Sequence, residues 1–364
     1  MPKLSGNKGE WSEIYVFLRL LELGKLYAAD ANLNKIDDVF YDIINIVREE
    51  NAGALEFRIN RTENTIFVVN SACNQVITEM PVDEFKRKAD ELYNEIVSEK
   101  TPSFYLESTE DFLNELNIGT LKAKSTDKAD IRIKIHDINT GYEAVQGFSV
   151  KSRLGSASTL INAGKTTNFI FEVTGNVNDN VMTVFNNCSK LFKSKFEYLR
   201  DYVNCDVRYV GMENEIFESN LLLIDGDLPK ICANMLVDYY STGINTVEKA
   251  VGVITSKNPL GYNLSKGHPF YSYKFKKMLT ECALGMLPSK AWDGTADATG
   301  GYIIVREDGE VLCYHLFNRN EFENYLLLNT KFETASTSRH QFGSIYKENG
   351  KYYLKLNLQI RFIK

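Results

Sequence analysis

The segment "ADIRIKIHDINTGYEAVQGFSVKS", from Ala129 to Ser152, constrains the fold of this chain more than any other. Apolar and polar residues alternate through 131–138 and again, less strictly, through 144–151, which is the period of β-strands with one buried face. The Asn-Thr-Gly between the two runs is a turn sequence, so the segment predicts two neighbouring strands joined by a tight turn. Asp130 at the start of the first strand and Lys151 at the end of the second would then lie close together.

A carboxylate beside an amine on neighbouring strands has two explanations. One is a cross-strand ion pair, which near the surface contributes only ~0–1 kcal/mol. The other is a Mg²⁺ site, because a hard divalent cation prefers carboxylate and carbonyl oxygens. A lysine beside such a site can orient or deprotonate the water that attacks a phosphate. The two strands alone leave both explanations open.

Composition narrows the classes of protein. The chain has 364 residues, which suits one large domain or two ordinary ones. Its six cysteines form no CxxC pair and its four histidines show no HxH or HxxxH spacing, so we expect reduced cytoplasmic thiols and no histidine-bound zinc. No apolar run reaches the ~18 residues of a membrane span, and the first residues lack the apolar core of a secretory signal. We therefore expect a cytoplasmic protein with no membrane partner.

The distribution of charge matters more than its sum. A net charge of −6 argues mildly against a nucleic-acid partner. Residues 120–170, however, contain eight Lys or Arg against four Asp or Glu, and residues 331–364 contain seven against two. Solvated charge could produce this pattern, and so could a basic cleft.

The periodicity of the remaining chain predicts an α/β (α+β) protein. A helix is expected over 9–24, where Gly24 would end it and where Glu10 and Glu13 fall inside the apolar arc. Glutamates in a first helical turn also suit the helix dipole, so their position has a purely structural explanation as well. Other expected elements are helices at 34–50, 81–99, 108–116, 156–165 and 186–202, a strand at 168–173, and strand pairs at 54–70, 301–317 and 345–362.

The order of these elements resembles the PD-(D/E)xK nuclease core, a mixed central sheet flanked by helices. The resemblance implies that a glutamate of the first helix joins the metal site, and the spacing of Gly9, Glu13 and Gly24 favours Glu13 over Glu10. It further implies Mg²⁺ held by Asp130, Glu13 and the Val150 carbonyl, with Lys151 positioning the water. Ser149 departs from the pattern, because Asp or Glu is expected two residues before the lysine.

Four longer strings resemble the HpaII-type restriction endonuclease family. They are GNKGEWSEIYVFLRLLELGKLYAAD, LKAKSTDKADIRIKIHD, GFSVKSRLGSASTLINAGKTTNFIF and STSRHQFGSIYKENGKYYLKLNLQIRF, and they span both ends and the middle of the chain. The resemblance implies a type II restriction endonuclease, with Mg²⁺-dependent hydrolysis of both strands of duplex DNA at CCGG. A palindromic site implies a homodimer on DNA.

Two polar segments are expected to contact the DNA. One directly follows Lys151, where backbone N–H groups at a helix start could bind phosphate. The other lies in a β-hairpin-rich C-terminal region, where Arg339 could read guanine. A capped polar helix and a structural histidine are the alternatives for single members. The candidates are Arg153, Ser156, Ser158, Thr159, Asn162, Lys165, Thr166, Asn168, Ser338, Arg339, His340 and Lys347.

We expect a catalytic core over 1–210 and a DNA-recognition region over 211–364. The departure at Ser149 supports a second hypothesis, a non-catalytic DNA-binding or regulatory protein on a degenerate nuclease core. That protein would bind DNA in a salt-sensitive manner without cutting it.

Overall fold

The two strands expected over residues 131–151 are present in the computed structural model, which describes residues 3–122, 129–138, 140–188 and 191–364. Strand β8 (Ile131–Asp137) pairs antiparallel with β9 (Tyr142–Ser152), with Ile131 opposite Phe148. The side chains of β8 alternate between buried and half-buried, which confirms its apolar face. Asn139 of the expected turn lies outside the described residues.

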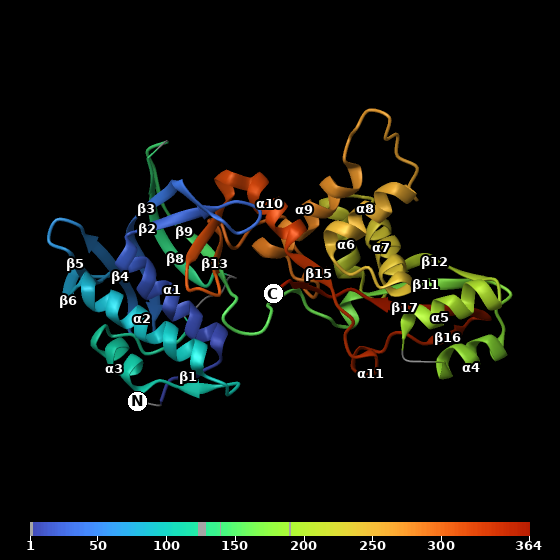
Figure 1. The fold of residues 1–364 in the computed structure, drawn as a ribbon, viewed down its shortest axis with the longest axis horizontal. Coiled ribbons are helices and arrows are strands. Elements are labelled where there is room, and N and C mark those ends of the chain that lie inside the picture. The colour runs from blue at the N-terminus through green and yellow to red at the C-terminus, as the bar shows by residue number, and fades with distance from the viewer. Residues whose placement is uncertain (1–2, 123–128, 139, 189–190) are drawn as a thin grey trace. The chain divides into compact units, whose positions relative to one another are not determined.

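The chain divides into two compact units, and each contains separate stretches of sequence (Figure 1). Unit 1 consists of Met1–Ser158 and Ala296–Phe322, with Lys364. Unit 2 consists of Thr159–Thr295 and Glu323–Ile363. The boundary expected after residue 210 therefore falls inside unit 2.

The described residues of unit 1 form a nine-stranded sheet of mixed direction. Strand β13 runs parallel to β9 and β14 runs parallel to β2, whereas the other neighbours are antiparallel. A further pairing of β2 with β3 closes the first six strands into a barrel. In spatial order the strands are β2 (Lys25–Ala29), β14 (Val311–His315), β13 (Gly301–Val305), β9, β8, β3 (Lys35–Glu50), β4 (Gly53–Asn60), β5 (Thr65–Asn70) and β6 (Gln75–Pro81).

Helix α1 (Lys8–Leu23) is the centre of the core of unit 1. Most of its residues are buried, because α2 (Val82–Ser98) packs on one side and β3 and β9 contact the other. Gly24 ends the helix in the left-handed conformation at φ 61°, as the sequence predicts. The unit is completed by α3 (Glu107–Glu115), by η3 (Leu316–Asn318) and by the short strand pair β1 (Ser5–Gly6) and β7 (Phe104–Tyr105) (Figure 1).

The prediction of a helix at 34–50 is wrong, because these residues form the long strand β3. The pairing of β3 with β8 shifts register between Ile43 and Asn45, which is the mark of a β-bulge. The buried positions therefore run 41, 43, 45, 46, 48 and 50, with two consecutive buried residues at the bulge. This interrupted alternation imitates the spacing of an amphipathic helix.

The described residues of unit 2 form two antiparallel sheets. The four-stranded sheet has the order β12 (Cys205–Met212), β11 (Asn168–Gly175), β17 (Lys351–Asn357) and β16 (Ile345–Glu348). The three-stranded sheet has the order β10 (Thr159–Ile161), β18 (Ile360–Phe362) and β15 (Thr330–Phe332). The hairpin of β16 and β17 turns at Asn349–Gly350 as expected.

Helices pack around these sheets (Figure 1). They are α4 (Asp179–Asn187), α5 (Phe192–Glu197), η2 (Tyr198–Tyr202), α6 (Glu215–Ile224), α7 (Leu228–Thr242), α8 (Val247–Lys257), α9 (Phe270–Leu284), α10 (Arg319–Leu328, which begins in unit 1) and α11 (Thr337–His340). The helix expected at 156–165 is wrong, since a loop, β10 and the short turn η1 (Lys165–Thr167) occupy this stretch. The described structure as a whole is a mixed α/β fold, as expected.

Candidate active site

Helix α1 places Glu13 beside the β8–β9 hairpin. The side chain of Asn7 caps the helix by accepting hydrogen bonds from the N–H groups of Gly9 and Glu10. One turn further, a 2.8 Å hydrogen bond joins the hydroxyls of Ser12 and Ser152 and ties the helix to the end of β9. The start of α1 is thus fixed against the strand that carries Lys151.

The backbone of the hairpin orients Asp130 towards β9. Its N–H donates to the carbonyl of Phe148 at 2.9 Å, which extends the antiparallel ladder by one residue. Its Oδ2 accepts a 2.7 Å hydrogen bond from the N–H of Val150 and a 3.0 Å bond from the Ser149 hydroxyl. Lys151 Nζ lies 3.9 Å from the same oxygen. The expected proximity of Asp130 and Lys151 is therefore present.

Ser149 connects the carboxylate to the amine. Its hydroxyl donates to Asp130 and accepts a 2.7 Å hydrogen bond from Lys151 Nζ. The amine also donates to the Val150 carbonyl at 3.1 Å and lies 5.2 Å from the ring centroid of Tyr302. Ser149 is 4% exposed, so the link between the two charged groups is buried, while the side chains of Lys151 and Asp130 are 24% and 30% exposed.

Burial dominates the electrostatics of Glu13 and Lys151. Burial, together with the neighbouring charge of Asp130, raises the pKa of Glu13 to about 8. Burial lowers the pKa of Lys151, and the two carboxylates only partly oppose that shift. Glu13 accepts no hydrogen bond from the residues that the structure describes. A half-buried carboxylate without a donor, next to a second carboxylate, is an environment that a cation would stabilise.

Glu10 is occupied by a different task. Its Oε2 accepts the N–H of Asn7 at 2.8 Å and completes the capping box of α1. Its Oε1 lies 3.2 Å from Nζ of Lys122. Lys122 lies in the basic segment 120–170, where no motif distinguishes it from the other lysines. These contacts hold the Glu10 carboxylate at the start of α1 and beside Lys122.

The residues present fit a Mg²⁺ ion with few protein ligands. The described part of the chain contains no group of three or more His, Cys, Asp or Glu side chains that could hold a metal. Glu13 and Asp130 supply two carboxylates, and the Val150 carbonyl supplies a third oxygen. Mg²⁺ commonly keeps several waters and takes only one or two protein carboxylates, so this donor set matches its chemistry.

The first group of candidate DNA contacts is divided between the units. Arg153, Ser156 and Ser158 belong to the loop after β9 in unit 1, and the N–H of Arg153 donates to the Val305 carbonyl. Since no helix begins here, the expected phosphate site at a helix start is absent from this described stretch. Thr159, Asn162, Lys165 and Thr166 belong to unit 2, where Asn162 and Lys165 are exposed.

Asn168 has a structural environment. It is fully buried at the start of β11, and its amide donates to Glu213 at 2.7 Å and to the His340 carbonyl at 2.9 Å. Its carbonyl oxygen accepts from the amide of Asn357 at 2.7 Å. The residue thereby fixes the backbone of α11 to the four-stranded sheet.

The second group of candidates surrounds α11. Ser338 and Arg339 are exposed, His340 is half-buried, and the Ser336 hydroxyl caps the turn by accepting from the N–H of Arg339. Lys347 is exposed on β16 and donates to Asp179 at 2.8 Å. Arg339 therefore stands on a well-anchored turn with its side chain in solvent.

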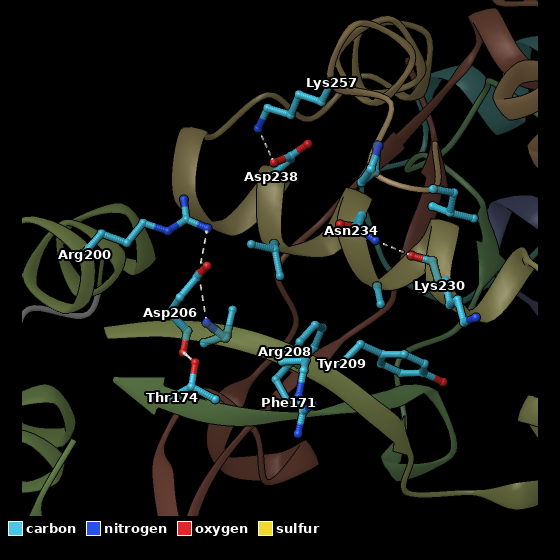
Figure 2. Close-up of a pocket in the computed structure, with 15 residues that line it drawn as sticks. Phe171, Thr174, Arg200, Asp206, Arg208, Tyr209, Lys230, Asn234, Asp238 and Lys257 are labelled. Atoms are coloured by element: carbon cyan, nitrogen blue, oxygen red, sulfur yellow. Dashed lines mark hydrogen bonds and ion pairs between the residues drawn. The ribbon is translucent and has the colours of Figure 1, made fainter. Parts of the chain in front are cut away.

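A separate pocket of about 670 Å³ in unit 2 lies between the β11–β12 strands and helix α7 (Figure 2). Its charged groups are largely paired with one another: Lys257 donates to Asp238 at 2.6 Å, and Arg200 lies 3.7 Å from Asp206. The pocket contains none of the residues selected from the sequence, and the carboxylates and amine of the candidate active site belong to unit 1.

The comparisons with known proteins identify the family of the chain. The chain belongs to the HpaII restriction endonuclease family, whose model matches residues 7–362. It is 43% identical over 363 residues to the type II restriction enzyme HpaII of Haemophilus parainfluenzae, a match that covers 99% of each chain. No solved structure matches the chain. The family and the class of enzyme expected from the sequence, a type II restriction endonuclease, are confirmed.

Among the described residues, every helix is too short or too polar to cross a lipid bilayer.

Proposed function

We propose that this chain hydrolyses one phosphodiester in each strand of duplex DNA at a short palindrome, CCGG, with Mg²⁺ as cofactor. The observation that carries the proposal is the convergence of Glu13, Asp130 and Lys151 within unit 1, with Ser149 joining the acid to the amine. This arrangement of α1 and the hairpin corresponds to what a PD-(D/E)xK core requires, and we assign the hairpin to such a core.

Each residue of the site has a distinct role in this proposal. Glu13, Asp130 and the Val150 carbonyl would hold Mg²⁺, which when bound would supply neutralising charge at the phosphate. Lys151 would orient the attacking water and stabilise negative charge that develops beside it. Burial lowers the pKa of this amine, which makes exchange of a proton with the water easier than for an exposed lysine. Ser149 would hold Asp130 and Lys151 at a fixed separation.

Recognition of the DNA is assigned chiefly to unit 2. Arg339 is our candidate for reading guanine, since its guanidinium can bind the O6 and N7 atoms bidentately. Its exposure on the anchored turn α11 supports this role. Ser338, His340 and Lys347 would contribute phosphate contacts, as would Arg153, Ser156 and Ser158 of unit 1 and Thr159, Asn162, Lys165 and Thr166 of unit 2.

A palindromic target calls for two active sites related by a two-fold axis, so we propose that the enzyme acts as a homodimer on DNA. We also propose that it acts in the cytoplasm. The six cysteines, all within the described residues, form no disulfide with one another, which is compatible with a reducing compartment.

Ser149 also bears on the alternative of a degenerate, non-catalytic nuclease core. A decayed site would be expected to lose the contacts between its remaining groups. Ser149 instead makes two short hydrogen bonds that connect Asp130 with Lys151. This organisation favours the catalytic function.

Cleavage of plasmid DNA tests the proposal. We expect wild type with Mg²⁺ to give discrete fragments whose sequenced ends share one four-base site, and we expect Lys151→Ala to reduce the rate at least about a hundredfold. The Lys134→Ala variant, which removes a lysine from β8 that is paired with Glu143, is the control and should cut like wild type. Salt-sensitive binding without cleavage by the wild type would support the non-catalytic alternative instead.

A further inference from the structure

A second amine lies at the candidate active site. Lys122 Nζ is 3.2 Å from Glu10 Oε1, one helical turn before Glu13. The side chain of Lys122 is 60% exposed, whereas that of Lys151 is 24% exposed. The negative charges of Glu10, Glu13 and Asp130 all raise the pKa of Lys122, so the amine is within electrostatic reach of both proposed metal ligands. Lys122 is thus a solvent-facing cation next to the carboxylates.

The backbone that leads to Lys122 is held by a buried ion pair on β3. Arg48 and Glu50 are 5% and 7% exposed, and Arg48 Nε donates to Glu50 Oε1 at 2.6 Å. Another nitrogen of the same guanidinium, Nη2, donates to the carbonyl of Thr120 and, at 3.1 Å, to that of Leu121. Glu50 Oε2 accepts the N–H of Gly119 at 3.1 Å and the Thr120 hydroxyl at 3.2 Å.

Stability alone does not explain the contacts of this ion pair. Burying two charges is costly, and a well-packed apolar pair often stabilises a core equally well. Here both charged groups direct their remaining hydrogen bonds to the three consecutive residues before Lys122. Arg48 also lies over the ring of Phe17, one turn of α1 beyond Glu13. The pair therefore fixes residues 119–121 relative to the helix that carries Glu13.

We propose that Lys122 binds a phosphate oxygen of the DNA strand being cut, and that the buried Arg48–Glu50 pair is the device that positions it. The inference rests on the proposed nuclease function of Glu13, Asp130 and Lys151. When these carboxylates are neutralised, their attraction for the ammonium of Lys122 weakens. Lys122 keeps its ion pair with Glu10, and the phosphate is a second anion that the remaining donors of its ammonium can bind. An exposed side chain on an anchored backbone binds it at little cost in ordering.

The first test measures binding, not cleavage. In the Lys151→Ala background, with Mg²⁺ at a fixed concentration, the affinity for a CCGG duplex is measured against salt concentration. The slope of log K against log salt is negative, and each lost phosphate contact reduces its magnitude by about 0.9. We expect Lys122→Ala to show this loss and Lys122→Arg to keep the full slope. Lys86→Ala, an exposed lysine on α2, is the charge-matched control and should leave the slope unchanged.

The second test measures single-turnover cleavage with Lys151 intact. We expect Lys122→Ala to be slower by about ten- to a hundredfold, and Lys122→Arg to recover most of the rate. If Lys122 had a purely structural role, Lys122→Ala would leave the salt slope unchanged, and Lys122→Arg would not recover the cleavage rate.

The third test concerns the positioning pair. The double variant Arg48→Met/Glu50→Leu replaces two buried charges with apolar residues of similar size, which keeps the core packed. We expect it to unfold at a temperature near that of wild type, yet to cleave as slowly as Lys122→Ala. Adding Lys122→Ala to this double variant should cause no further loss, because both changes remove the same contact.

Three failures can be told apart. If wild type does not cut DNA with any divalent metal, the proposed function fails and takes the inference with it. If wild type cuts and Lys122→Ala cuts equally fast with an unchanged salt slope, only the role of Lys122 is overturned. In a third case, Lys122→Ala reduces the salt slope as expected, but its loss of cleavage rate adds to that of the Arg48→Met/Glu50→Leu double variant. That result would overturn only the role of the Arg48–Glu50 pair.

Discussion

At the scale of single residues, Ser149 is the most informative position. A carboxylate here would stand about 3 Å from Asp130, and two like charges at that distance disfavour each other's ionised form. The serine avoids this repulsion and adds a donor to Asp130 and an acceptor for Lys151. We infer that the site exchanges one metal oxygen for a more rigid relation between acid and amine, and that Glu13 provides the second carboxylate.

The two hydrogen bonds of the Ser149 hydroxyl predict the effect of Ser149→Ala. Loss of the hydroxyl leaves Asp130 and Lys151 without their common partner, so we expect the rate of cleavage to fall about tenfold while DNA affinity stays unchanged. The free energy of unfolding should fall by about 1 kcal/mol, since one buried hydrogen-bonding group is removed. Ser241→Ala removes a hydroxyl that bonds only within α7 and is the control. An unchanged cleavage rate for Ser149→Ala would contradict the proposed role.

Glu13 predicts a pH dependence of stability in the metal-free protein. Because burial and Asp130 raise its pKa from 4.5 to about 8, the folded state binds a proton more tightly than the unfolded state. Stability is therefore lost as the pH rises from about 4.5 to 8. We expect Glu13→Gln to be more stable than wild type at pH 9, by on the order of 2 kcal/mol after allowance for solvent screening, and equal to it near pH 4.5. Denaturant titrations in EDTA at both pH values measure the difference, and a gain of equal size at both would refute the assignment.

At the scale of elements, local signals sufficed where the residues that decide a structure are neighbours in sequence. Helix α1 was predictable because its cap, its apolar arc and Gly24 all lie within it. The β8–β9 pair was predictable from strict alternation on β8 and the Asn-Thr-Gly sequence. Strand β3 was missed because a bulge breaks its period, and residues 156–165 were missed because β10 is defined by pairing with the distant strand β18.

The clustering of Glu13 with the hairpin required the nuclease resemblance, since no local pattern joins α1 to residues 130–151.

The capping box of α1 yields a prediction that separates stability from chemistry. Asn7→Ala removes two hydrogen bonds to the first helical turn, so we expect the free energy of unfolding to fall by about 1 kcal/mol. The cleavage rate at 25 °C should stay within about threefold of wild type, because the buried residues of α1 still hold the helix in place. Asn178→Ala, which removes the cap of α4 in unit 2, serves as the comparison for a lost cap far from Glu13 in sequence. A loss of cleavage as large as that of Glu13→Gln would show that the cap is part of the active site.

At the scale of the whole molecule, sequence order does not follow the units. The β13–β14 hairpin enters the sheet of unit 1 by pairing beside β9 across about 150 residues, and no property of its own sequence specifies that partner. The division expected at residue 210 could therefore not account for it. The net charge of −6 is a sum over the whole chain, so it does not show the basic segments from which DNA contacts are expected.

The proposed homodimer makes a prediction about the products of mixed assemblies. If one active site faces each strand of the palindrome, a dimer of one wild-type and one Lys151→Ala chain can cut only one strand. We therefore expect a fixed amount of wild type, mixed with increasing Lys151→Ala, to accumulate nicked circular plasmid before linear plasmid. Lys134→Ala, mixed in the same proportions, should give linear product throughout. Sedimentation of Lys151→Ala with a CCGG duplex should show two chains per duplex, and a duplex with a scrambled site should not assemble them. A single chain per duplex, together with linear product from every mixture, would mean that one active site cuts both strands in turn.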